Sequence, residues 1–114
     1  MSDNSTDTNS TDISNGDDEQ QYWNLVEGFI NSANDACDNS DPGLVAAALL
    51  NAAARFNAFV VAHSSLDKNE FAEDVEGTTN YLTGRYRDFL KEHMDDYREN
   101  YTSLIGNREL PESE

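Results

Sequence analysis

Two histidines are the side chains of this sequence best suited to binding a metal ion. They are His63 and His93. A di-iron site in a helical bundle needs Glu-x-x-His on two helices, but the residues three positions before these histidines are Val60 and Leu90. A histidine with one acidic residue a turn away is more often a solvated or structural contact. We therefore expect no metal site and no cofactor.

Nucleophilic catalysis also lacks a suitable set of residues. The single cysteine, Cys37, lies near Asp35 and Asp38, whose negative charges disfavour a thiolate. The serines cluster in tails and turns, and no glycine-rich phosphate-binding loop is present. We predict no catalytic residue and favour a non-enzymatic protein, while an acid–base pair among the 23 Asp and Glu residues stays open.

One arginine lies inside an apolar segment, LVAAALLNAAARFNAFVVAH, at residues 44–63. Arg55, if buried there, needs a carboxylate partner, and Asn51 one turn earlier could complete such a network. The alternative is a pocket between helices in which Arg55, Asn51 and Asn57 bind a small anionic ligand, with or without catalysis. Both interpretations stay open from the sequence.

Aromatic residues are the other candidates for a functional surface. Tyrosine and tryptophan are enriched where one end of a side chain is apolar and the other is wet, as at interfaces. Helical spacing also fits the edge of a core. The residues that we predict to contact another subunit or a protein partner are Trp23, Tyr86, Tyr97 and Tyr101.

The apolar segment, residues 44–63, predicts the central helix of a small bundle. It is apolar on nearly every side, so it must be surrounded, and three polar residues within it argue against lipid. Asp41 and Pro42 predict its start. A first helix with a wide apolar face is expected from about Asp18, capped by Asp17, to Cys37.

A third helix is the longest that the sequence predicts. Asp67 is a suitable N-cap with Glu70 at the third helical position, and Leu66 can pack against Phe71 as a hydrophobic staple. Gly106 is a plausible C-terminal cap. A continuous helix of this length overhangs the second, so we expect either a break near Gly77–Gly84, which makes a fourth helix, or pairing with another subunit.

The net charge of −16 limits the partners of this 114-residue chain. Residues 20–105 carry fourteen acids and six bases, or −8, so the folded part is itself acidic. Without a basic cluster, we expect no direct binding to nucleic acid and none to membranes. Solubility explains most such acidity; a mimic of the nucleic-acid backbone is the alternative. The N-terminus lacks the features of a signal peptide, which predicts a cytoplasmic protein.

The composition divides the chain into three parts. Residues 1–16 are almost entirely Ser, Thr, Asp, Asn and Gly, and such a segment cannot bury enough apolar surface to order itself. We predict a disordered polar and acidic tail over 1–16, a single helical domain over 17–106, and a frayed acidic tail over 107–114.

Short segments in each predicted helix resemble a known family. They are Tyr22-Trp23 and Phe29-Ile30 in the first, Arg55-Phe56-Asn57-Ala58-Phe59 in the second, and Tyr86-Arg87 and Asp95-Asp96-Tyr97 in the third. Over roughly residues 20–103 the chain is similar to the short bacterial proteins grouped as domain of unknown function 3144. That family has no assigned activity, so the resemblance implies a bacterial, cytoplasmic, helical protein and no catalytic residue.

Together these observations predict an all-α fold, a small antiparallel three-helix bundle. The leading functional hypothesis is a non-enzymatic protein-interaction or self-associating module, in the form of a homo-oligomer or with a protein partner. The alternatives are binding of an anionic ligand at Arg55 and Asn51, and an acidic mimic of nucleic acid.

Overall fold

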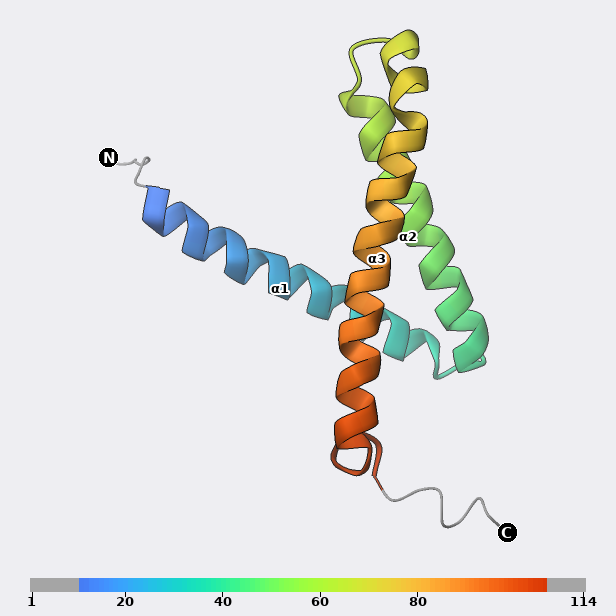
Figure 1. Ribbon diagram of the computed structural model, residues 1–114. Coiled ribbons are helices and arrows are strands. Elements are labelled where there is room, and N and C mark those ends of the chain that lie inside the picture. Colours follow the sequence, from blue (N-terminus) through green and yellow to red (C-terminus); the bar gives the residue numbers. More distant parts are fainter. Residues whose placement is uncertain (1–10, 107–114) are drawn as a thin grey trace. The chain divides into compact units, whose positions relative to one another are not determined.

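Three helices make up the part of the chain that the computed structural model describes, residues 11–106 (Figure 1). They are α1 (Thr11–Ala36), α2 (Pro42–Ser64) and α3 (Lys68–Ile105), and no strand occurs within those residues. This confirms the predicted all-α class with three helices. The antiparallel packing of the helices stays a prediction. The chain divides into two units, Met1–Val60 and Val61–Glu114.

Helix α1 begins at Thr11, seven residues earlier than the predicted start at Asp18. Residues 11–16, predicted as part of a disordered tail, are therefore helical, and Asp17 is an interior residue rather than the cap. Ser, Thr, Asp and Asn are the residues that helix N-termini favour, so a segment rich in them suits the beginning of a helix. The remaining predicted tails, residues 1–10 and 107–114, lie outside the described residues.

The start of α2 is as predicted. The Asp41 carboxylate accepts hydrogen bonds from the backbone N–H groups of Gly43, at 2.9 Å, and Leu44, at 3.3 Å. These are two of the donors that a helix N-terminus leaves without an intrahelical partner. Pro42 is the first residue of the helix, where its missing N–H costs nothing.

Both predicted ends of α3 are confirmed. The Asp67 carboxylate accepts from the Glu70 backbone N–H at 2.9 Å, and the Glu70 side chain accepts from the backbone N–H of Leu66. Gly106, with φ of 96°, donates its N–H to the Thr102 carbonyl at 2.8 Å. Leu66 remains 87% exposed, so the predicted staple onto Phe71 buries little of it.

The predicted break near Gly77–Gly84 is wrong, because α3 runs through these residues. A methyl group at Gly77 or Gly84 would meet no atom within 4 Å, so neither glycine marks a kink or a close approach. Two glycines cost about 2 kcal/mol against alanine, which the helix tolerates. Non-helical backbone angles occur instead at Asn100 (φ −122°, ψ 29°), whose side-chain amide donates to the Asp96 carboxylate at 2.7 Å.

Side-chain burial differs most from the expectation. No residue of α2 is buried, although its apolar circumference predicted a helix surrounded by others. Among residues 16–106 no side chain is fully buried. Partial burial follows one side of α1 and continues just past its end, at Val26, Ala33 and Cys37. A similar line of partly buried residues lies early in α3, at Phe71, Thr78 and Leu82.

Candidate interaction surface

Large apolar side chains are exposed along all three helices. On α2 the exposed fractions are 64% for Leu44, 65% for Phe56 and 58% for Phe59. The rings of Phe56 and Phe59, one turn apart, lie 6.0 Å from each other. Isolated exposed apolar residues are ordinary, but contiguous ones mark surfaces that contact another molecule. Helix α2 is therefore a candidate interaction surface.

The polar residues of α2 are not spread evenly around the helix. Steps of four and three residues keep side chains on one side of a helix with about 3.6 residues per turn. One such line contains both Asn51 and Arg55 and otherwise small or apolar residues. We call it the Asn51–Arg55 line, and it consists of Leu44, Ala48, Asn51, Arg55 and Ala58.

Arg55 has no acidic partner in the described part of the chain. It is exposed, and it forms no ion pair within residues 11–106. The residues one turn before and after it in α2 are Asn51 and Phe59, neither of which carries a negative charge. The interpretation of Arg55 as half of a buried pair with a carboxylate therefore stays a prediction.

Asn57 does not join the other two residues of the predicted anion pocket. It follows Arg55 by two positions, which is about 200° around the helix axis. Its side-chain amide donates to the Ala53 carbonyl of its own helix at 2.8 Å. The structure thus places Asn51 and Arg55 on one line and Asn57 on the far side, with its donor already used.

The predicted interface aromatics are all partly exposed. Trp23 is 52% exposed and packs edge-on against Tyr22, with ring centroids 4.9 Å apart. Tyr86, Tyr97 and Tyr101 on α3 are 45–49% exposed. Tyr97 and Tyr101 follow Tyr86 by eleven and fifteen residues, a spacing that keeps the three side chains on one side of a regular helix. Their role as interface residues stays a prediction.

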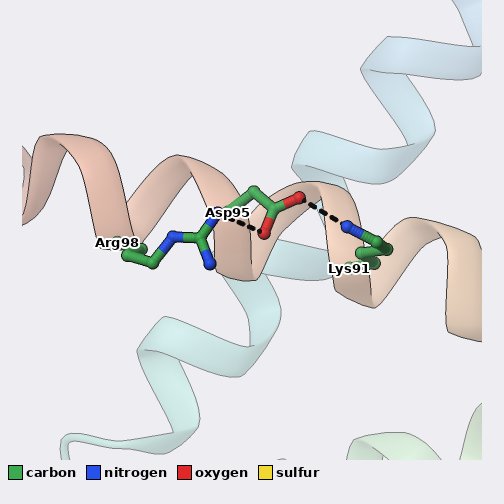
Figure 2. A network of polar contacts seen from close by, with 3 residues as sticks. All are labelled: Lys91, Asp95 and Arg98. Atoms are coloured by element: carbon green, nitrogen blue, oxygen red, sulfur yellow. Dashed lines mark hydrogen bonds and ion pairs between the residues drawn. The ribbon is translucent and has the colours of Figure 1, made fainter.

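A different side of α3 carries a network of ion pairs. The Asp95 carboxylate contacts Lys91 Nζ at 3.0 Å and Arg98 Nη2 at 3.2 Å (Figure 2). The hydrogen bond from Lys91, followed by the positive charges of Lys91 and Arg98, lowers the pKa of Asp95 below its usual value of 3.8. Such partly exposed pairs add little stability.

Charge is distributed very unequally among the three helices. Helix α1 contains six acids and no base, and α3 contains nine acids and five bases. Helix α2 contains no acid at all, and Arg55 is its one Lys or Arg. Charge counts over the tails and the folded part do not show this difference. The absence of Asp and Glu from residues 42–64 is visible in the sequence, but it becomes a property of one helix only once the helix boundaries are known.

Two further properties of the described residues bear on the site. Within residues 11–106 no group of three or more His, Cys, Asp or Glu side chains could hold a metal ion. Of the helices in that range, α2 is the one whose length and composition would allow it to cross a membrane. Core helices of soluble proteins meet the same criterion, and Arg55 near the middle of α2 would cost about 2.5–3.5 kcal/mol in a bilayer.

These features define a small acidic helical protein whose apolar helix faces are exposed. A family model described as "Protein of unknown function (DUF3144)" matches residues 22–98. The chain therefore belongs to that family, as the resemblance in all three helices predicted. No curated protein and no solved structure matches the chain.

Proposed function

We propose that this protein is a non-enzymatic interaction module that self-associates through the apolar faces of its helices. The observation that supports the proposal is that no side chain among residues 16–106 is buried, while large apolar side chains of every helix are exposed. Covering these side chains with protein releases free energy, because it removes apolar surface from water.

The gain from covering these side chains is large for a chain of this size. Complete burial of a phenylalanine side chain contributes about 1.5–3 kcal/mol. Because 65% of Phe56 is exposed, covering that residue alone contributes about 1–2 kcal/mol. A contact that covers three such residues on each copy contributes about 6–12 kcal/mol, which is comparable to the cost of association of about 4–15 kcal/mol.

The solution mass of the full-length chain tests this proposal. Multi-angle light scattering coupled to size exclusion, from about 5 to 500 μM to bracket micromolar affinity, should give a dimer or larger species whose population rises with concentration. Phe59→Ser on α2 should lower that population, and Lys91→Ser should not, because the Lys91 side chain is 74% exposed and belongs to α3. A helical chain by circular dichroism that remains monomeric throughout would contradict self-association.

A second candidate is supported by Arg55, which lies beside Asn51 without an acidic partner within residues 11–106. This pair could bind a small anion, with or without catalysis. The test is thermal unfolding with inorganic phosphate or pyrophosphate at millimolar concentration. A rise in Tm that Arg55→Met removes would favour this function. No rise in Tm with either anion would exclude these two ligands.

A further inference from the structure

We infer that the surface of self-association is α2, packed antiparallel against α2 of a second copy, with Arg55 of each copy opposite Asn51 of the other. This inference rests on the proposed self-association and specifies its surface and register. It is argued from the charge of the helices and from the spacing of residues along the Asn51–Arg55 line.

Electrostatics selects α2 over the other two helices. Each copy carries a net charge of −16, so two copies repel each other as they approach. Helices α1 and α3 carry six and nine acids, so a contact through either of them would have to use a side that is free of acids. A contact through α2 brings together two helices that contain no acid, so it adds no repulsion between carboxylates across the contact.

The spacing of residues on α2 suits helix-to-helix packing. Residues 44, 48, 51, 55 and 58 follow one another in steps of four, three, four and three, the repeat by which paired helices interlock their side chains. Alanines at 48 and 58 flank the two polar residues. Small side chains allow two helix axes to approach closely, so the polar side chains between them can reach the other helix.

The polar residues select the antiparallel orientation. In a parallel pair, Arg55 of one copy would lie beside Arg55 of the other, and two like charges would face each other. In an antiparallel pair with its twofold axis level with residue 53, position 51 faces 55 and position 48 faces 58. Arg55 then donates to the side-chain oxygen of Asn51 in the second copy, and the same contact recurs by symmetry.

Arg55 thereby gains the partner that it lacks among the described residues of its own chain. A single polar contact at the centre of an otherwise apolar helix pair also fixes register, because any shift along the axis would leave Arg55 and Asn51 against alanine or leucine. Phe59 lies beside the line, about 40° from Arg55 around the helix axis, where it can cover the contact from water.

Cysteine cross-linking tests the orientation directly. Asn51→Cys and Arg55→Cys are prepared separately in full-length chains that carry Cys37→Ala, then mixed and oxidised. Antiparallel pairing brings the thiol introduced at position 51 of one variant against the thiol introduced at position 55 of the other. The mixed disulfide should therefore exceed both same-variant disulfides several-fold. In that mixed dimer the second contact, Arg55 with Asn51, is intact. Ala53→Cys, on the opposite side of α2, is the matched control and should cross-link little.

Each outcome of the cross-linking has a distinct meaning when the mass of the same samples is measured by light scattering. Same-variant disulfides in excess would overturn the antiparallel register. A dimer that cross-links no better at 51 and 55 than at 53 would overturn α2 as the surface while leaving self-association intact. A monomer would overturn both. Co-sedimentation with phosphatidylcholine vesicles, with positions 51 and 53 equally protected from a water-soluble maleimide, would assign α2 to lipid and also overturn the inference.

Discussion

Replacing Asn51 by aspartate should strengthen the association of two copies. In the antiparallel arrangement the new carboxylate at position 51 of each copy faces Arg55 of the other, so two contacts of a guanidinium with a neutral amide become two ion pairs. Exposed ion pairs contribute about 0.2–1 kcal/mol each. Two of them contribute about 0.4–2 kcal/mol, which corresponds to a dissociation constant lower by about 2-fold to 30-fold.

Two other effects of Asn51→Asp need to be separated from this gain. The carboxylate also lies one turn before Arg55 of its own helix, where a pair contributes about 0.3–0.5 kcal/mol. That contact exists in monomer and dimer alike, so it does not change the dissociation constant. The added negative charge increases repulsion between copies, and a control must carry the same charge.

Asn57→Asp is that control, because it makes the same chemical change on the far side of α2. Sedimentation equilibrium at about 0.1 M salt, where the screening length is about 10 Å, compares the two variants at equal net charge. Asn51→Asp should dimerise more tightly than Asn57→Asp, and Arg55→Met should abolish the difference. Equal dissociation constants, or a tighter Asn57→Asp dimer, would refute the proposed register.

Four further outcomes are expected. Raising NaCl from about 0.05 to 0.5 M shortens the screening length from about 14 to 4 Å, so light scattering should show tighter self-association; weaker association would contradict the charge argument. Gly77→Ala should raise the unfolding free energy by about 0.5–1 kcal/mol, because the added methyl meets no atom; a lower Tm would show that another surface covers this residue. Asp67→Ala should lower the unfolding free energy by about 0.5–2 kcal/mol because it removes the N-cap, with Asp74→Ala as the control inside the helix. In an NMR titration the Asp95 carboxyl should titrate with a pKa below 3.8, and Lys91→Met should raise that pKa. Because the pKa of Asp95 is lower in the folded state, the pair stabilises the fold at pH values above the unfolded pKa. This stabilisation is lost as pH falls through the folded pKa.

Helix ends are the most predictable part of this fold. Asp41, Asp67 and Gly106 are each recognisable from the sequence because a cap depends on side chains and backbone groups within about four residues. Their partners in the structure, such as Leu44 and Glu70, lie inside that range. The number of helices follows directly from these stop and start signals.

Predictions that require a distant partner are less successful. The break near Gly77–Gly84 assumes that a long helix must fold back, yet backbone hydrogen bonds carry α3 through two glycines. Leu66 has the correct position for a staple but is almost fully exposed. The prediction for Arg55 assumes an acid in its own chain. Neither propensity nor periodicity reports which surfaces meet, so the predictions for the break and for Arg55 depend on information that local sequence does not contain, whereas the staple is local and Leu66 nevertheless stays exposed.

The apolar composition of α2 requires that the helix be covered, whereas its residues are exposed, and packing against a second copy would resolve this difference. A helix that is apolar on nearly every side needs cover, yet no residue of α2 is buried. Lipid would cover it at the cost of burying Arg55, Asn51 and Asn57. A second α2 covers the apolar surface, brings no acid into the contact, and places an amide oxygen opposite each guanidinium. If that is the reason α2 lacks acids, introducing a single glutamate at Ala48 should weaken the dimer, whereas the same change at Ala53 should weaken it less.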